Sequence, residues 1–248
     1  MYLHKLRHAI HKTILSAADL LYPSVCSACG NPADRPGCHI CWQCFSTLSL
    51  EAGYCCSLCG HPIQTTEDHS FICGACRHIP PAFDRARVAG RFEGKLRHLT
   101  HMFKYRHALW LAADLAELLH GSLLSQFNYP AIDLILPIPL HTTRARSRGY
   151  NQAELLATHL GHHLNRPVVP QALIRTRNTG TQTRLTLTAR HKNVTGAFAV
   201  SDSGWVKGRT ILLVDDVMTT GATFSSAART LKKSGAWRVW AVALARGQ

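Results

Sequence analysis

The residues with the most distinctive chemistry form the segment Ile211-Leu-Leu-Val-Asp-Asp-Val-Met-Thr-Thr-Gly-Ala-Thr223. Its four leading apolar residues predict a buried strand, and two carboxylates stand at the carboxyl end of that strand. A helix is expected to begin near Ala222, and free amides at a helix N-terminus bind phosphate. Carboxylates accept hydrogen bonds from vicinal hydroxyls, and one of them can hold magnesium. We therefore predict a sugar-phosphate site composed of Asp215, Asp216, Met218, Thr219, Thr220, Gly221, Ala222 and Thr223.

An ordinary strand-to-helix turn with a capping threonine is the plain alternative for this segment. Two adjacent aspartates at the end of a buried strand are costly without a partner. That cost favours a binding site over a simple turn.

A second group of polar residues follows an apolar run over residues 132–136 that ends at Pro137-Ile-Pro139. This group predicts cationic and amide donors beside the start of a helix, from Arg144, Arg146, Arg148, Asn151 and Gln152. Such donors could bind a diphosphate or a nucleic acid backbone, or they could form a solvated basic turn. Between Leu134 and Ser201 the chain has nine basic residues and one acidic residue, Glu154. This asymmetry favours an anionic partner.

All ten cysteines fall within residues 26–76, and most of them form Cys-x2-Cys pairs. Four thiolates at ~2.3 Å make a closed tetrahedral zinc site, and zinc would supply folding energy that a short segment cannot obtain from a core. A disulfide scaffold is the alternative, but nothing in the sequence suggests secretion. The predicted ligands of structural zinc are Cys26, Cys29, Cys41, Cys44, Cys56, Cys59, Cys73 and Cys76.

The ligand pairing within this cysteine-rich segment stays open, because sequential and cross-braced arrangements both satisfy the spacing. Cys38 and Cys55 offer alternative spacings, and His39, His61 and His69 could replace a thiolate. A purely structural role for the zinc is favoured, because no His-Glu-x-x-His pattern provides an open catalytic site.

The segregation of the cysteines and the Pro80-Pro81 pair divide the chain into three parts. Residues 1–22 have apolar residues at helical spacing and predict a basic amphipathic helix, which could dock on a membrane or nucleic acid or pack on its own domain. Residues 23–80 form the zinc module, and residues 81–248 form an α/β domain. No apolar run reaches the ~18–20 residues of a membrane span, and the start of the chain lacks the apolar core of a signal peptide. We expect a cytoplasmic protein.

Within residues 81–248, apolar runs of strand type alternate with segments of helical periodicity. Strands are expected at 83–92, 132–136, 197–200, 210–214 and 237–245, and helices at 93–105, 108–127, 148–165 and 222–234. This alternation predicts a parallel sheet with ligand at the carboxyl ends of its strands. Residues 173–190 predict a long loop, whose part 175–190 could close over a bound diphosphate as a lid.

The aromatic residues and the net charge bear on nucleic acid binding. Trp237 and Trp240 lie in the last apolar strand and are expected to pack in the core, whereas Tyr150 is the aromatic expected to be exposed and able to stack on a base. The chain has 28 Lys and Arg against 14 Asp and Glu, a net charge of +14. Such a charge favours polyanionic partners, although a basic surface can also serve solubility alone.

The segment 211–223 resembles the signature for 5-phosphoribosyl-1-pyrophosphate (PRPP) in type I phosphoribosyltransferases. The resemblance implies that Asp215 and Asp216 hold the ribose hydroxyls, that residues 218–223 cradle the 5′-phosphate, and that magnesium accompanies the diphosphate. Purine-salvage members carry an acidic residue where this chain has Thr219, and this departure weakens a purine-salvage assignment.

The whole chain also resembles the ComF (competence protein F) family over about residues 15–245. The resemblance rests on the stretch from Leu136 to Gln152, on Gln182-Thr-x-Leu185 with Arg190 and Asn193-Val-x-Gly-x-Phe198, and on cysteine knuckles preceding a PRPP signature. It implies a parallel phosphoribosyltransferase-like sheet with helices on both faces. It places Arg190 with the anion-binding or DNA-binding residues.

For function, the resemblance implies natural competence or use of extracellular DNA. The protein would handle incoming single-stranded DNA in the cytoplasm, together with proteins of the DNA-uptake machinery. The alternative is an active phosphoribosyltransferase that transfers phosphoribosyl from PRPP to an unidentified small acceptor. A zinc-dependent interaction adaptor is a third possibility.

Overall fold

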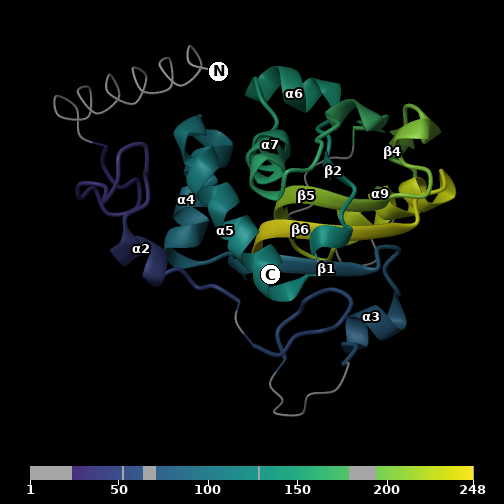
Figure 1. Ribbon diagram of the computed structural model, residues 1–248, viewed down its shortest axis with the longest axis horizontal. Coiled ribbons are helices and arrows are strands. Elements are labelled where there is room, and N and C mark those ends of the chain that lie inside the picture. Colours follow the sequence, from purple (N-terminus) through teal and green to yellow (C-terminus); the bar gives the residue numbers. More distant parts are fainter. Residues whose placement is uncertain (1–23, 52, 64–70, 128, 179–193, 248) are drawn as a thin grey trace, which may run out of the picture.

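The computed structural model describes residues 24–51, 53–63, 71–127, 129–178 and 194–247. The helix predicted over residues 1–22, His69, and residues 179–190 of the loop predicted over 173–190, including Arg190, lie outside the described residues. The start of that loop was predicted wrongly, because residues 173–175 form strand β3. Within the described ranges, a four-stranded sheet forms the centre of the molecule, and the cysteine-rich segment lies along one edge of it (Figure 1).

The four strands of this sheet are parallel and follow the order β1-β6-β5-β2. They span β1 Arg85–Arg91, β2 Leu134–Pro137, β5 Thr210–Met218 and β6 Arg238–Arg246. The two central strands, β5 and β6, are almost entirely buried, as expected for a parallel sheet that is covered on both faces. The predicted parallel sheet is therefore confirmed.

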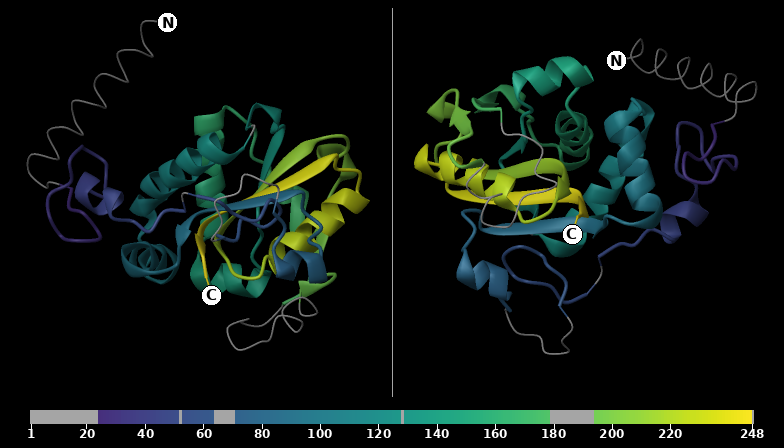
Figure 2. Two further views of the ribbon diagram at one scale, coloured as in Figure 1. Left: turned by 90° about the horizontal axis from the view of Figure 1, so that it is seen from below. Right: turned by 180° about the vertical axis from the view of Figure 1, so that it is seen from behind.

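Helices cover both faces of the sheet (Figures 1 and 2). Because side chains alternate along a strand, Leu212 and Val214 join the buried cluster that contains α5 and α7, whereas Ile211 and Leu213 join the cluster that contains α9. The covering helices are α4 Gly94–Tyr105, α5 Ala112–Gln126, α7 Gln152–Leu164 and α9 Ala222–Lys233. Short 3-10 turns occur at Leu109–Leu111, Tyr129–Ala131, Pro170–Ala172 and Ser203–Trp205.

The helix predicted over 148–165 is two helices, α6 Thr142–Arg148 and α7. Gly149 adopts a left-handed conformation with φ 77° and ends α6, because glycine reaches positive φ without steric cost. Asn151 then caps the start of α7, and its side chain accepts a hydrogen bond from the backbone N–H of Ala153 at 3.2 Å. The arginine-rich segment is thereby a separate short helix that projects from the end of the sheet.

Three further predictions need correction. The strand predicted over 197–200 is β4 Phe198–Val200, which pairs antiparallel with β3 Leu173–Arg175 in a small separate sheet. Strand β5 continues to Met218, so the two aspartates lie within the strand and not beyond its end. Trp240 is buried as expected, but Trp237 precedes β6 and is 67% exposed, so the prediction of core packing for Trp237 was wrong.

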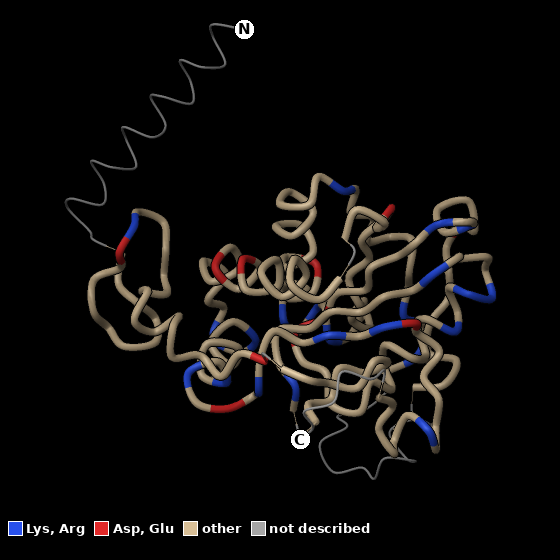
Figure 3. Tube along the Cα trace, turned by 60° about the horizontal axis from the view of Figure 1, so that its bottom comes forward, with Lys and Arg blue, Asp and Glu red and all other residues tan. Residues whose placement is uncertain are grey.

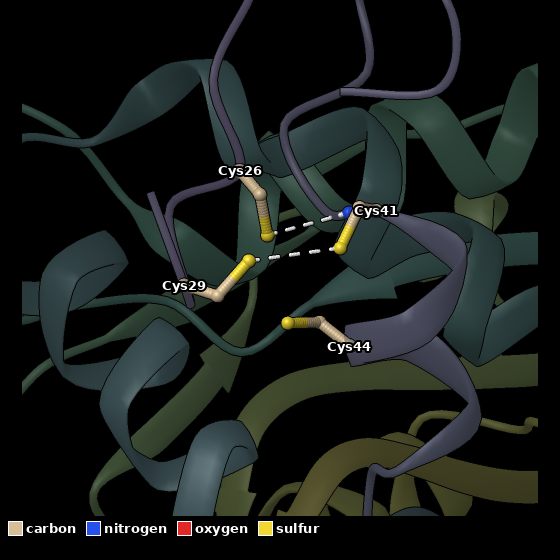
Figure 4. A group of neighbouring side chains, drawn as sticks. All are labelled: Cys26, Cys29, Cys41 and Cys44. Atoms are coloured by element: carbon tan, nitrogen blue, oxygen red, sulfur yellow. Dashed lines mark hydrogen bonds between the residues drawn. The ribbon is translucent and has the colours of Figure 1, made fainter. Parts of the chain in front are cut away.

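The cysteines form two groups, each drawn from two consecutive Cys-x2-Cys pairs, so the pairing is sequential. Within each group, all four sulfur atoms lie within 4.8 Å of one another. Figure 4 shows the group of Cys26, Cys29, Cys41 and Cys44. A tetrahedral zinc site with Zn–S distances of ~2.3 Å requires sulfur atoms about 3.8 Å apart. The Cys29–Cys41 and Cys59–Cys73 sulfur pairs are separated by 3.8 and 3.7 Å, so the donor set fits zinc. The two groups are Cys26, Cys29, Cys41 and Cys44, and Cys56, Cys59, Cys73 and Cys76.

Backbone amides support thiolates in both groups. The N–H of Cys41 donates to the sulfur of Cys26 at 3.3 Å, and the N–H of Cys73 donates to the sulfur of Cys56 at 3.4 Å. Burial raises the pKa of Cys26, but hydrogen bonds from the amides of Cys41, Ala28 and Cys29 outweigh it and lower this pKa to about 6. A thiolate is the form that binds zinc. Cys38, Cys55, His39 and His61 stand outside both groups.

The zinc module covers the edge of the sheet at β1. The backbone N–H of Glu51 donates to the carbonyl of Ala89 at 2.9 Å, and the N–H of Arg91 donates to the carbonyl of Ser49 at 2.8 Å. The N–H of Ala86 donates to the carbonyl of Leu58 at 2.6 Å. An uncovered edge strand invites pairing with other chains, so the module protects β1. Its short helices are α2 Trp42–Ser46 and α3 Gly74–His78.

The two groups predict a zinc stoichiometry. Native mass spectrometry should find two zinc ions per chain in the parent protein. Cys44→Ser and Cys76→Ser should each lose one ion and lower the Tm, because each removes a ligand from a different site. Cys38→Ser is the matched control and should keep both ions. Loss of zinc from Cys38→Ser, or two ions retained in both ligand variants, would contradict this arrangement.

Candidate functional site: a cavity at the carboxyl end of the sheet

A cavity of about 740 Å³ opens where β5 ends. It brings together the acidic segment of β5, the turn into α9, and the region of α6 and α7, which lie far apart in the sequence. The predicted residues that line it are Asp215, Asp216, Met218, Thr219, Gly221, Ala222, Thr223, Arg144, Arg148, Asn151 and Gln152.

Two predicted site residues lie beside the cavity and not in its wall. Arg146 is exposed and is not among the residues that line the cavity. Thr220 contributes from within the turn, since its Oγ1 accepts a hydrogen bond from the N–H of Ala222 at 3.3 Å. Arg146 is therefore a natural control for its two neighbours, Arg144 and Arg148.

Asp216 is paired with Lys104, which lies in the last turn of α4 and which was not predicted as a site residue. The Lys104 Nζ atom lies 2.8 Å from Oδ2 and 3.0 Å from Oδ1 of Asp216. The Asp216 side chain is 7% exposed, so this is a nearly buried ion pair. Burial raises the pKa of Asp216, but the Lys104 ammonium outweighs this and holds the pKa below its ordinary value.

Asp215 is in a different protonation environment. Burial, together with the negative charge of Asp216, raises the pKa of Asp215 to about 7. Its Oδ1 accepts the N–H of Asp216 at 2.9 Å. One carboxylate of the pair is thus firmly ionised, while its neighbour can gain or lose a proton near neutral pH.

The turn between β5 and α9 requires a glycine. Gly221 has φ 76°, and a Cβ atom at this position would lie 2.8 Å from Cε of Met218. The first backbone N–H groups of α9 follow directly and have no carbonyl partner within the helix. Because the helix dipole adds a partial positive charge there, the turn has the properties of a phosphate-binding site.

The opposite wall is held by the side chains at the start of α7. Gln152 is 2% exposed, and its Oε1 accepts from Arg148 Nη1 at 2.9 Å while its Nε2 donates to the carbonyl of Lys104 at 3.3 Å. The Arg148 guanidinium also lies over the Tyr105 ring, 5.3 Å from its centroid. Asn151 donates to the carbonyl of Ile138 at 3.2 Å. Gln152 and Asn151 therefore fix the position of this wall, and Arg144 and Arg148 give it positive charge.

Tyr150 also has a positioning role. It is half-buried, and its hydroxyl donates to the carbonyl of Phe103. The prediction that it is the exposed aromatic was wrong, because Gly149 turns it back against α4.

One further arginine, Arg175, lines the cavity, and another, Arg246, contacts the turn that precedes α9. Arg175 lines the cavity from β3. Its pKa is lowered mainly by burial and also by repulsion from the positive charge of Arg144. Arg246, at the end of β6, donates to the carbonyl of Thr219 at 3.4 Å and to the carbonyl of Cys59. Arg246 therefore joins the second zinc group to the turn that follows the aspartates.

Comparisons with known proteins agree with this architecture. The phosphoribosyl transferase domain family matches residues 132–248, and the double zinc ribbon domain family matches residues 17–77. Competence protein F of Haemophilus influenzae is 32% identical over 197 residues, which cover 77% of this chain and 84% of that protein. The chain belongs to the competence protein F (ComF) family.

Other family members extend this similarity. The DNA utilization protein YhgH of Salmonella typhi is 32% identical over 233 residues, covering 92% of this chain and 99% of that protein. Competence protein ComFC of Bacillus subtilis is 29% identical over 210 residues, covering 81% of each chain. In the part of this ComF-family chain that the structure describes, no helix combines the length and hydropathy needed to cross a membrane.

The Lys104–Asp216 pair predicts a pH-dependent loss of stability. In the parent, the pKa of Asp216 is lower in the folded state than in the unfolded state, where it is ~3.9. The pair therefore stabilises the fold fully above pH ~3.9, and this stabilisation is lost as the pH falls through the folded-state pKa. In Lys104→Met, burial and Asp215 raise the Asp216 pKa instead. The free energy of unfolding should then fall by about 3 kcal/mol near pH 8 and by much less near pH 5, where Asp216 takes up a proton.

Urea unfolding at both pH values measures this effect. Arg97→Met, an exposed position on the same helix, is the control and should change stability little at either pH. Lys104→Met/Asp216→Asn should recover much of the loss. A Lys104→Met variant as stable as the parent at both pH values would refute the pairing.

Proposed function

We propose that the cavity binds PRPP or a closely related sugar phosphate. The observation that carries this proposal is the meeting of the aspartate pair, the N-terminus of α9 and an arginine wall in one cavity. Asp215 and Asp216 would accept the ribose hydroxyls, residues 218–223 would cradle the 5′-phosphate, and Arg144 and Arg148 would contact the diphosphate. The excess of cations over carboxylates suits a ligand with several negative charges.

Magnesium would enter this site with the diphosphate, since hard oxygen ligands from phosphate and carboxylate are the ones it prefers. The Asp215 carboxylate fits that chemistry. Burial and the charge of Asp216 raise the Asp215 pKa, so a cation or a hydroxyl donor bound beside it would favour its ionised form.

We further propose that the protein acts in the cytoplasm in natural competence or DNA utilisation and handles incoming single-stranded DNA. The names of its relatives support this role, as does a net charge of +14. Proteins of the DNA-uptake machinery would be its partners. In this proposal the sugar-phosphate site serves or regulates the DNA role.

Phosphoribosyl transfer to a small acceptor is a second candidate function, and the Asp215 pKa of about 7 favours it. A carboxylate with that pKa could take the proton of an acceptor as the acceptor attacks ribose C1 and pyrophosphate leaves with the bonding electrons. Thr219 occupies the position at which purine-salvage members carry an acid. Pyrophosphate release with a panel of nucleobases and amines distinguishes the two candidates, because a binding protein releases none.

The PRPP proposal predicts ligand-dependent stabilisation. PRPP with magnesium at about 100 times its Kd should stabilise the protein by about 2.7 kcal/mol and raise the Tm by about 5–10 °C. Asp215→Asn/Asp216→Asn should abolish the shift, and Arg144→Ala/Arg148→Ala should reduce it strongly. Arg146→Ala, which alters an equal charge outside the cavity, should keep it. No shift in the parent would refute the proposal.

The proposed link between the sugar-phosphate site and DNA utilisation predicts how a variant of this site affects transformation. In a transformable host that lacks its own ComF-family gene, the parent gene should restore transformation. The Asp215→Asn/Asp216→Asn gene should not, provided that immunoblotting shows equal protein levels. Full restoration of transformation by the double variant would show that the DNA role does not need the sugar-phosphate site, and would contradict the proposed link.

A further inference from the structure

The opposite end of the sheet, where β5 and β6 begin, carries a second surface with a distinct composition. Two turns meet there: the N–H of Gly208 donates to the carbonyl of Gly235 at 2.8 Å, and the N–H of Trp237 donates to the carbonyl of Arg209 at 2.9 Å. We call this the far-end surface, formed by Trp205, Lys207, Arg209, Lys233, Trp237 and Arg238. The first five residues of β5, 210–214, separate this surface from Asp215, where the cavity lining begins, a distance of roughly 17 Å.

Exposed aromatic rings are the first feature of the far-end surface. Trp237 is 67% exposed and Trp205 is 38% exposed. The Arg238 guanidinium lies over the Trp237 ring, 5.9 Å from its centroid. A large ring left in water, with a cation at its face, is typical of a binding surface and not of a monomer's core.

The charge of the far-end surface is the second feature. Lys207, Lys233 and Arg238 are exposed, and Arg209 is half-buried beside them. The neighbouring Lys232 is already paired with Asp84 at 2.7 Å. Two other exposed acids lie nearby: Asp202 accepts from the N–H of Gly204 at 2.8 Å, and Asp133 accepts from the N–H of Thr210 at 2.8 Å. Figure 3 shows several Lys and Arg residues at this end of the molecule, on the right of the view, with others elsewhere along the chain.

We propose that the far-end surface binds single-stranded DNA, with bases stacked on Trp237 and Trp205 and phosphates held by the surrounding cations. Exposed rings and cations together at one end of the sheet match a strand whose base faces are open. A duplex hides its base faces, and an apolar protein partner gains little from the cations. The inference rests on the proposed DNA role and assigns that role to a place away from the sugar-phosphate cavity.

The first zinc group offers a built-in comparison. Trp42 is 56% exposed there, and Arg35 lies 5.1 Å from its ring centroid, so the ring and cation resemble those at Trp237. Acidic residues surround this pair, since Asp34, Asp114 and Glu117 line the same shallow hollow and Glu117 lies 3.8 Å from Arg35. Phosphates would be repelled, so Trp42→Ala is a matched control.

The test is fluorescence anisotropy of a labelled dT20 oligonucleotide with the full-length protein. Trp237→Ala should raise the Kd about 5- to 150-fold, since base–aromatic stacking is worth about 1–3 kcal/mol, whereas Trp237→Phe should recover most of the affinity. Lys233→Ala/Arg238→Ala should reduce the slope of log K against log salt by about 1.4. Trp42→Ala should leave both quantities unchanged. The Trp237 and Lys233/Arg238 variants should keep the Tm of the parent, because these side chains are exposed.

Competition separates the far-end surface from the cavity. Saturating PRPP with magnesium should leave oligonucleotide affinity unchanged, and Trp237→Ala should bind PRPP as the parent does. If PRPP displaces the oligonucleotide, if Trp237→Ala binds as tightly as the parent, or if a duplex of equal length binds equally well, the location is wrong while the DNA role stands. Failure of the parent to bind dT20 would overturn the DNA role itself.

Discussion

Two adjacent carboxylates in a buried strand constrain much of this structure. Asp215 and Asp216 lie in β5, where apolar neighbours penalise charge, and the Lys104 ammonium offsets the charge of Asp216. Lys104 can reach the strand only because α4 ends beside it. The carbonyls of Phe103 and Lys104 then accept hydrogen bonds from Tyr150 and Gln152, so α4 also fixes the start of α7. The buried charge, the supporting helix and the arginine wall are one connected set of contacts.

The zinc module is part of the same body and not an appendage. Its backbone completes the edge of β1, and its cysteines share buried clusters with the helices on both faces of the sheet. Arg246 contacts the carbonyls of Cys59 and Thr219, so the second zinc group supports the turn that precedes α9. Zinc therefore contributes to the geometry of the cavity as well as to the stability of the module.

Much of the fold could be predicted because it depends on local patterns. Four consecutive apolar residues before two aspartates indicated a central strand, and cysteine spacing indicated two zinc groups. Lys104 could not be predicted, because 112 positions separate it from Asp216 and other basic residues share its helix. The burial of Trp237 was predicted wrongly for another reason. Trp237 stands just before Arg238, where β6 begins, and an error of one residue in a strand boundary moves a side chain between core and solvent. The position of Tyr150 depends on the turn at Gly149, which could not be predicted because the helical pattern of residues 148–165 indicated one continuous helix.

The central claim is that the carboxyl end of the sheet is a sugar-phosphate site within a DNA-handling protein. Hydrogen–deuterium exchange with and without PRPP and magnesium tests it most directly. The account predicts slower exchange in peptides that cover residues 215–224 and 142–152, and unchanged exchange in peptides that cover 203–209 and 233–238. Protection at the far-end surface, or none at residues 215–224 under saturating ligand, would contradict it.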